Sequence, residues 1–133
     1  MLTTLRIPTR QEMEMVDMTA QIRRLVAQSG VEEGTVLLYV PHTTCGITIQ
    51  ENADPGVQHD MLLILRETAP RVDRRYRHIE ANSASHVQAS MMGFSAFVFV
   101  HVGRLVLGQW QAIYLAEFDG PRERTVHVKV LAD

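Results

Sequence analysis

The chain has 133 residues and a formal net charge of −2, with 46% hydrophobic and 21% charged residues. A chain of this length and apolar content is expected to fold as one globular domain, and its slight negative charge argues against binding nucleic acid by bulk attraction. Its single cysteine excludes an intramolecular disulfide and, with an N-terminus unlike a secretion signal, favours a cytoplasmic setting. The longest apolar runs have five residues, far short of the roughly 20 that cross a bilayer, so no membrane partner is expected.

The N-terminal region predicts two short strands followed by a helix. Apolar and polar side chains alternate over residues 5–7 and 12–15, which is typical of half-buried strands. Asp17 is a suitable N-cap for the next segment, in which apolar residues recur at helical spacing, and Gly30 supplies the stop. The sequence therefore predicts an amphipathic helix between Asp17 and Gly30, with Arg23 on its solvent side.

The next region predicts further strands and a second helix. Residues 35–40 and 43–49 are rich in β-branched and apolar side chains and are separated by Pro41, so they form two strands or one interrupted strand. Asp54-Pro55 combines an N-cap with a proline at the first helical position, and the helix that starts there ends before Pro70. Its expected apolar face consists of Val57, Met61, Ile64, Leu65 and Thr68.

The rest of the chain predicts a polar loop, a short helix and four strands. Residues 70–82 carry many charges without periodicity, and a long polar loop in a small domain is usually functional or mobile. Ser83 or Ser85 is expected to cap a short helix that Gly93 closes. Strands are predicted over residues 94–101, 104–107, 110–118 and 124–131. Helices segregated from a mainly antiparallel sheet define an α+β domain over the whole chain.

Polar functional groups gather in three blocks, residues 41–54, 78–86 and 119–122, and the common phosphate-loop, zinc and nucleophile-elbow motifs are absent. By pattern alone, the first block is a strand that runs through a polar turn into a helix cap. It also carries more polar groups than a cap requires, at the end of an apolar strand that is suited to present them to a ligand. Cys45 has no charged neighbour in the sequence that would lower its pKa, so we interpret it as a packing residue.

The second and third blocks suggest a metal site and an anion site. His78, Glu80 and His86 carry metal-ligand atoms within nine residues, although this spacing is no known zinc signature and each histidine taken singly is more typical of a surface. The Asp-Gly-Pro-Arg segment that ends at Arg122 is first of all a turn. At the mouth of this turn, the Arg122 guanidinium is suited to bind a phosphate or carboxylate through two contacts, with Arg124 on the same face if the last strand has begun.

Several longer motifs, taken together, are specific. They are His42-Thr-Thr-Cys-Gly-Ile-Thr-Ile-Gln-Glu-Asn-Ala-Asp-Pro55, His59-Asp-Met61, Ser85-His86 with Ala89-Ser90 and Gly93, Gly103-Arg-Leu-Val-Leu-Gly-Gln-Trp-Gln111, Glu117 and Asp119-Gly-Pro-Arg122. With these motifs, which cover most of the chain, the sequence resembles the YjbQ-like family, small proteins described as secondary thiamine-phosphate synthases. The resemblance implies a compact α+β domain with a barrel-like, mainly antiparallel sheet, two main helices and one short helix. It also implies a homotrimer with sites in polar clefts near the subunit contacts.

The reaction that the resemblance implies joins a pyrimidine bearing a diphosphate leaving group to a thiazole phosphate, which gives thiamine phosphate. Such a reaction needs the charge of the departing diphosphate to be neutralised, usually by a divalent metal and cationic side chains. Candidates for this role are Arg104, Arg122, Glu51, Asp54 and Asp60. From the matching motif positions, we expect catalytic roles for His42, Glu51, Asp60 and Arg122, and substrate contacts from Thr43, Thr44, Asn52, Trp110 and Arg122.

Three histidines suggest a further site. His42, His78 and His86 are expected to converge and bind a divalent metal, zinc or magnesium, or failing that a phosphate. Histidine ligands fit magnesium poorly, and this leaves two other functions open. One is a metal-dependent hydrolase of a phosphate ester or amide, and the other is a non-enzymatic trimeric protein that binds a small anion. In each case the expected partner is a small phosphorylated or anionic metabolite.

Overall fold

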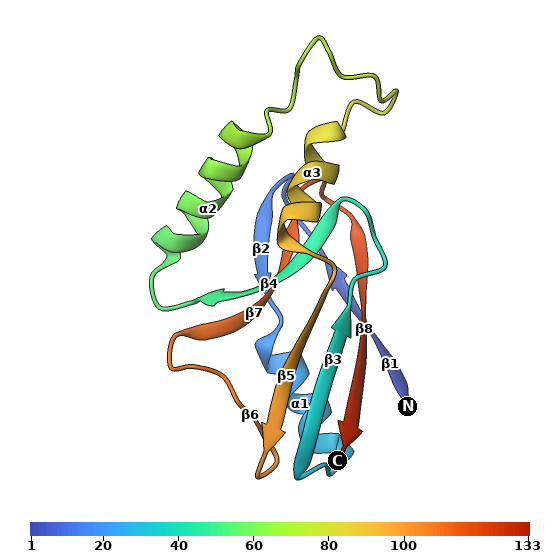
Figure 1. Cartoon of the computed structure of the whole chain (residues 1–133), viewed down its shortest axis with the longest axis vertical. Helices are drawn as coiled ribbons and strands as arrows, with labels where there is room; N and C mark the ends of the chain where they lie inside the picture. The colour runs from blue at the N-terminus through green and yellow to red at the C-terminus, as the bar shows by residue number, and fades with distance from the viewer.

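The computed structural model describes residues 1–133 and contains eight strands and three helices (Figure 1). The strands are β1 (Leu2–Pro8), β2 (Glu14–Asp17), β3 (Glu33–Tyr39), β4 (Cys45–Glu51), β5 (Ser95–His101), β6 (Arg104–Leu105), β7 (Gln111–Glu117) and β8 (Glu123–Ala132). The helices are α1 (Thr19–Ser29), α2 (Pro55–Thr68) and α3 (Ser83–Met92). Each predicted element is present in the predicted order, which confirms the α+β fold class with its two main helices and one short helix.

The strands form two antiparallel sheets that curl around one core (Figure 1). The larger sheet has the order β1-β8-β3-β5-β6, and the smaller one has the order β2-β7-β4. In the smaller sheet β4 and β7 pair along their whole length, from Cys45 opposite Glu117 to Glu51 opposite Gln111. The curled sheets form a half-barrel, in agreement with the barrel-like sheet expected from the sequence.

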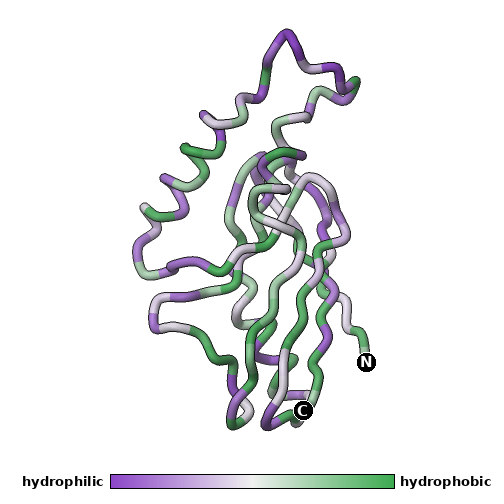
Figure 2. Tube along the Cα trace, in the orientation of Figure 1, coloured by the Kyte–Doolittle hydropathy of each residue, from purple (hydrophilic) through white to green (hydrophobic).

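The core lies between the inner faces of the sheets and helix α1. In β8, Val126 and Val128 are buried, whereas the alternating His127 and Lys129 belong to the outer face. Helix α1 contributes Ile22 to the same apolar cluster. Figure 2 shows the matching hydrophobic stretches along β3 and β5, and it shows the loop over residues 70–82 as mainly hydrophilic.

Helices α1 and α2 begin at the predicted signals. Asp17 accepts a hydrogen bond from the backbone N–H of Thr19 at 2.9 Å, but Met18 holds the N-cap position, so α1 begins one residue later than predicted. Asp54 is the N-cap of α2 and accepts from the N–H of Gly56 at 2.8 Å. A short carboxylate reaches the free N–H groups of the first helical turn, which explains both contacts.

Helix α3 differs from the prediction at its start. Asn82 holds the N-cap position, so the expectation that Ser83 or Ser85 caps the helix is wrong. Ser85 lies inside α3, where its hydroxyl donates to the carbonyl of Phe118 at 2.7 Å and so ties the helix to the end of β7. Gly93 closes the helix with a φ of 91°, as predicted.

Helix α2 is buried along a narrower stripe than its sequence suggests. Leu65 is its one buried residue and packs in a second small cluster with Phe118. Ile64, which was predicted on the apolar face, is 61% exposed, and the partly buried Leu62 packs against the cluster instead. None of the three helices has the length and apolar character needed to span a membrane.

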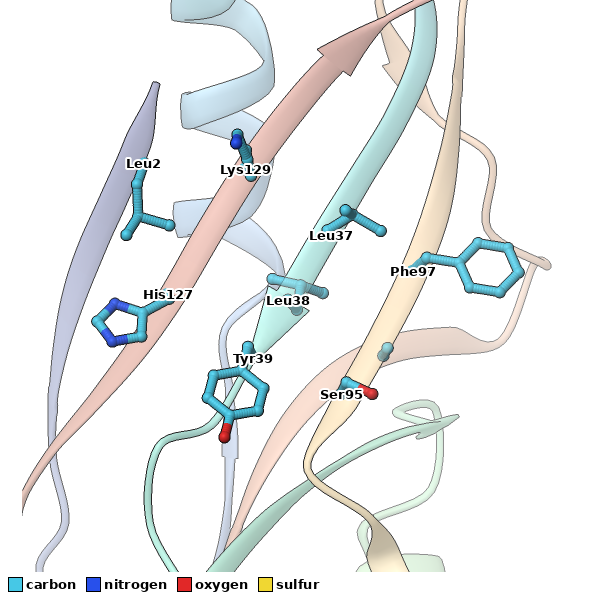
Figure 3. Close-up of a pocket in the computed structure, with 9 residues that line it drawn as sticks. Leu2, Leu37, Leu38, Tyr39, Ser95, Phe97, His127 and Lys129 are labelled. Carbon is cyan, nitrogen blue, oxygen red and sulfur yellow. The ribbon is translucent and has the colours of Figure 1, made fainter.

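The outer face of the five-stranded sheet is apolar and exposed. Leu37 and Tyr39 of β3 lie beside Phe97 and Phe99 of β5, and each of these four side chains is more than two-fifths exposed. A groove of about 660 Å³ crosses this face (Figure 3), lined by Leu2, Leu37, Leu38, Tyr39, Ser95, Ala96, Phe97, His127 and Lys129. Monomeric proteins rarely expose a contiguous apolar patch of this kind.

Candidate functional site

A polar cavity of about 410 Å³ opens where three segments that are distant in the sequence meet. These segments are the connection between β3 and β4, the loop that leads into α3, and the turn between β7 and β8. The cavity is lined by Pro41, His42, Thr43, Thr44, His78, Glu80, Asn82, His86, Arg122 and Arg124, none of them hydrophobic. Such a wall favours a small charged ligand over an apolar one.

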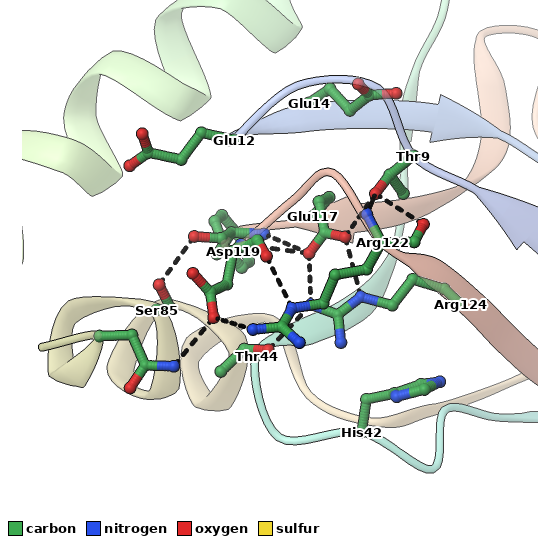
Figure 4. A network of polar contacts seen from close by, with 12 residues as sticks. Thr9, Glu12, Glu14, His42, Thr44, Ser85, Glu117, Asp119, Arg122 and Arg124 are labelled. Atoms are coloured by element: carbon green, nitrogen blue, oxygen red, sulfur yellow. Dashed lines mark hydrogen bonds and ion pairs between the residues drawn. The ribbon is translucent and has the colours of Figure 1, made fainter. Parts of the chain in front are cut away.

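A buried ion pair supports one side of the cavity (Figure 4). Arg124 is 3% exposed and donates from Nε to Oε1 of Glu117 at 2.8 Å and from Nη2 to Oε2 at 2.5 Å. The same Nη2 donates to the hydroxyl of Thr44 at 2.8 Å. Glu117 also accepts from the Thr9 hydroxyl at 2.6 Å and from two backbone N–H groups. Every oxygen of the carboxylate is satisfied, and the Arg124 guanidinium is held in one orientation.

Asp119 holds a second arginine at the edge of the cavity. The Arg122 guanidinium donates from Nε to the Asp119 carbonyl and from Nη2 to Oδ2 of its carboxylate, both at 2.9 Å (Figure 4). Asp119 Oδ2 also accepts from the side-chain amide of Asn82 at 2.8 Å. Burial alone would raise the pKa of Asp119, but the hydrogen bonds from Asn82 and Arg122 outweigh burial and lower it. Asp119 is therefore a carboxylate at pH 7 that positions Arg122.

His42 contributes a hydrogen-bond donor to the cavity. Its Nε2 accepts the backbone N–H of Thr125 at 3.0 Å. Burial lowers the pKa of His42, and the nearby Arg124 guanidinium lowers it further. The ring is therefore neutral at pH 7, with its proton on Nδ1. Because Nε2 is engaged with Thr125, the Nδ1–H group remains for a ligand.

The other two histidines come together at the same cavity. The rings of His78, from the 70–82 loop, and His86, from α3, have centroids 5.3 Å apart and stand nearly perpendicular. Together with His42 they line one cavity, yet no group of three His, Cys, Asp or Glu side chains is arranged to hold a metal ion. In this arrangement the three histidines do not fit a metal, because Nε2 of His42 faces the backbone of Thr125. Metal binding stays a prediction.

Four of the predicted site residues, Glu51, Asn52, Asp60 and Trp110, lie outside this cavity. Glu51 ends β4, and beside it the N–H of Asn52 donates to the carbonyl of Trp110 at 3.0 Å. Asp60 is exposed on α2. β4 lies between His42 and the group around Glu51. Its seven residues span about 20 Å, because an extended strand rises about 3.3 Å per residue. The first polar block of the sequence is thus divided between the two ends of one strand.

Two further candidates for charge neutralisation also lie elsewhere. Asp54 caps α2, and Arg104 of β6 lines a separate pocket with Arg23 of α1. The structure brings together Arg122 and Arg124, as the turn before β8 suggested, and places Thr43 and Thr44 beside them, but it does not bring Arg104 to this group.

Sequence reasoning missed the role of the Glu117–Arg124 pair. The available signal was the alternation in β8, because Arg124 falls on the same side of the strand as the buried Val126 and Val128. A charged residue on the buried side of a strand needs a partner of opposite charge. That partner, Glu117, comes from the neighbouring segment and was not predictable from local spacing.

Cys45 lies at the start of β4 and is fully buried. Burial raises the pKa of its thiol to about 12. A thiol that stays protonated at neutral pH is a poor nucleophile, in agreement with the interpretation of Cys45 as a packing residue.

Comparison with known proteins finds relatives of this chain in one protein family. A family model described as "UPF0047 protein YjbQ-like" matches residues 3–133. The UPF0047 protein YugU of Bacillus subtilis is 47% identical, over 98% of this chain and 99% of its own length. A UPF0047 protein of Methanocaldococcus jannaschii is 43% identical over 100% of this chain and 96% of its own length.

Solved structures show the same fold. A crystal structure of a YjbQ/UPF0047 family protein from Clostridium acetobutylicum superposes with a TM-score of 0.94 at 43% identity, covering 97% of this chain and 99% of the other. A conserved protein from Thermus thermophilus superposes with a TM-score of 0.90 at 43% identity and the same coverage of both chains.

Proposed function

This chain belongs to the YjbQ-like family of UPF0047 proteins, and from that membership and the polar cavity we propose that it is an enzyme acting on a small phosphorylated metabolite. The proposed reaction is of the thiamine-phosphate synthase type, in which a pyrimidine diphosphate is joined to a thiazole phosphate. One observation carries the proposal: Arg122, Arg124 and His42 present N–H donors to a cavity that has no hydrophobic wall.

The donors are held in place before a ligand arrives. The Nη1 groups of Arg122 and Arg124 have no hydrogen-bond partner within the chain, while the remaining guanidinium nitrogens are fixed by Asp119 and Glu117. The Thr44 hydroxyl accepts from Arg124 and keeps its own proton for a ligand. Donors that need no reorientation stabilise a developing negative charge more strongly than mobile ones.

The transfer reaction needs hydrogen-bond donors that stabilise a departing diphosphate. A bond forms between the thiazole nitrogen and the pyrimidine methylene carbon, and the bond from that carbon to the diphosphate oxygen breaks. Diphosphate leaves with the electron pair, so negative charge grows on the leaving oxygen. In this proposal Arg122, Arg124 and the Nδ1–H of His42 stabilise that charge.

The first test is an assay with both thiamine precursors and Mg²⁺, using protein from a host that lacks its own synthase. We expect thiamine phosphate above background, and we expect Arg122→Ala to lower kcat/KM by about 30-fold, because one charge-assisted contact is worth about 2 kcal/mol. Arg104→Ala, which removes an arginine from a different pocket, is the matched control and should retain wild-type kinetics.

No product above background, together with no effect of Arg122→Ala on phosphate affinity, would reject the proposal. A rise in melting temperature with phosphorylated ligands but no turnover would instead indicate a small-anion-binding protein, since a ligand at about a hundred times its Kd stabilises by roughly 2.7 kcal/mol.

We also propose that the chain assembles as a homotrimer through the outer face of the five-stranded sheet. The support is the exposed apolar surface over β3 and β5, where Phe97 and Phe99 are each 58% exposed and their rings lie 5.4 Å apart. Closed symmetric association is the usual way in which such a face is covered.

Phe97→Glu is expected to dissociate the assembly, because it places a charge in the apolar contact. Sedimentation should show three chains of 15.0 kDa for the wild type and one for the variant. Val72→Glu, an equal change at an exposed apolar residue of the 70–82 loop, is the control and should leave the assembly intact. A wild-type monomer at micromolar concentration would overturn the trimer.

A further inference from the structure

The cavity wall contains a buried acceptor without a donor. Asn82 is 4% exposed, and its Oδ1 is the one buried side-chain nitrogen or oxygen of the chain that has no hydrogen-bond partner. An unsatisfied buried amide oxygen costs about 1–3 kcal/mol, so native proteins rarely keep one without a use. Asn82 is also a lining residue of the polar cavity, so the missing donor has to come from a ligand that displaces the atoms now covering Oδ1.

The orientation of the amide follows from its neighbour. Nδ2 of Asn82 donates to Oδ2 of Asp119 at 2.8 Å. A flipped amide would bring Oδ1 against this carboxylate oxygen, acceptor against acceptor. Asp119 is in turn held by Arg122 at 2.9 Å and approached by Arg71 at 3.5 Å. The network therefore fixes Oδ1 as the free group.

The usual role of such a side chain is not used here. Asparagine at an N-cap commonly accepts a hydrogen bond from the first helical turn, but the Asn82 side chain makes no capping bond. The N–H groups of Ser85 and His86 donate to the backbone carbonyl of Asn82 instead, at 3.0 and 3.4 Å. The residue before it, Ala81, has a φ of 58°, a conformation that a side chain rarely adopts. The start of α3 thus leaves the amide oxygen unoccupied.

We propose that Asn82 is a specificity-determining residue, and that the ligand of the cavity carries an amino or ammonium N–H donor beside its phosphate, which Asn82 Oδ1 accepts. The proposal rests on the proposed function, since it assumes that Arg122 and Arg124 bind the phosphate. Glu80 lines the same cavity and adds a carboxylate, which favours a nitrogen donor of positive charge over a hydroxyl. The substrate class is therefore an amino-substituted phosphate ester or diphosphate.

Four simple probes test this by calorimetry at pH 7. Inorganic phosphate reports the anion site alone. Phosphoethanolamine has an ammonium group, propyl phosphate replaces it with a methyl group of similar size, and phosphocholine keeps the positive charge but has no N–H. We expect wild-type protein to bind phosphoethanolamine about tenfold more tightly than either analogue, because both leave Oδ1 unpaired.

Asn82→Leu should remove this preference, measured as the ratio of the phosphoethanolamine and propyl phosphate affinities, because the Asn82 amide also holds Asp119 and its loss weakens phosphate binding in general. Urea denaturation at pH 7 shows that the variant is folded. Equal wild-type affinity for the three esters would overturn the inference while leaving the proposed function intact. If no probe binds, the proposed anion site fails, and the inference fails with it. One more result would overturn the inference. If wild-type protein shows no preference among the esters, but Mg²⁺ or Zn²⁺ raises its phosphate affinity and Asn82→Leu abolishes that gain, then Oδ1 is a metal ligand.

Discussion

Replacing Arg124 by methionine is expected to lower the free energy of unfolding by about 3–5 kcal/mol, because it leaves a buried carboxylate without its cationic partner. Glu117 is 0% exposed and receives two of its hydrogen bonds from Arg124, at 2.8 and 2.5 Å. Methionine retains most of the apolar stem of the side chain, so the change chiefly removes the charge and its donors. Urea denaturation at pH 7 measures the loss.

Two further variants separate the ion pair from other causes. Arg122→Met breaks a half-exposed pair with Asp119 and should cost less than about 1 kcal/mol. The double change Arg124→Met with Glu117→Leu removes both charges but leaves the Thr9 hydroxyl and two backbone N–H groups without this acceptor, so it should regain part of the stability lost by Arg124→Met alone. If the loss of stability in the double variant equals the sum of the losses in Arg124→Met and Glu117→Leu measured singly, the unpaired carboxylate is not the cause.

The loss should also depend on pH. Burial alone would raise the pKa of Glu117, but hydrogen bonds from Arg124, Thr9 and the backbone of Asp119 outweigh burial and lower it. A carboxyl group whose pKa is lowered by folding stabilises the protein above its unfolded-state pKa of about 4.3, and this contribution is lost as the pH falls through the folded pKa. In Arg124→Met the hydrogen bonds from Arg124 no longer oppose the effect of burial, so the pKa of Glu117 is higher and its carboxyl takes up a proton. The difference between the two proteins should therefore shrink below about pH 4.

Gly46→Ala is expected to cost about 3 kcal/mol, the upper part of the range for overpacking a tight contact. A Cβ atom at position 46 would lie 2.6 Å from the carbonyl oxygen of Gly93 and 2.9 Å from Cβ of Met92, closer than such atoms approach. The end of α3 would have to move away from β4. This movement would strain the hydrogen bond from the N–H of Ile47 to the Gly93 carbonyl, now 3.0 Å long.

The same change should weaken anion binding, because α3 carries Asn82 and His86 to the cavity. Phosphate titration and urea denaturation of one preparation measure both effects. Gly30→Ala is the control: a Cβ there meets nothing within 4 Å, and only its φ of 69° is unfavourable, at about 1 kcal/mol. Wild-type stability and phosphate affinity in Gly46→Ala would show that the close approach of β4 does not position α3.

The sequence by itself determined the elements and their order. Period-2 alternation located the strands, apolar residues at helical spacing located α1 and α2, and Asp54-Pro55 and Gly93 marked helix ends that the structure confirms. These signals are local, because side-chain direction and cap geometry depend on a few neighbouring residues. The same locality explains the wrong cap for α3, where the Ser85 hydroxyl donates to the carbonyl of Phe118, a residue distant in the sequence, instead of capping the helix.

Only the tertiary structure decided which polar residues meet. His42 and Glu51 belong to one continuous motif, yet they lie at opposite ends of β4, which is about 20 Å long at 3.3 Å per residue. His42 instead lines one cavity with Arg124, more than 80 positions away, because antiparallel pairing brings the start of β4 beside the end of β7 and the start of β8. Burial then made the Glu117–Arg124 pair obligatory and left the amide of Asn82 with one oxygen free. The spacing of residues along the chain does not predict such contacts, since they depend on sheet register and on the desolvation of charges within the folded core.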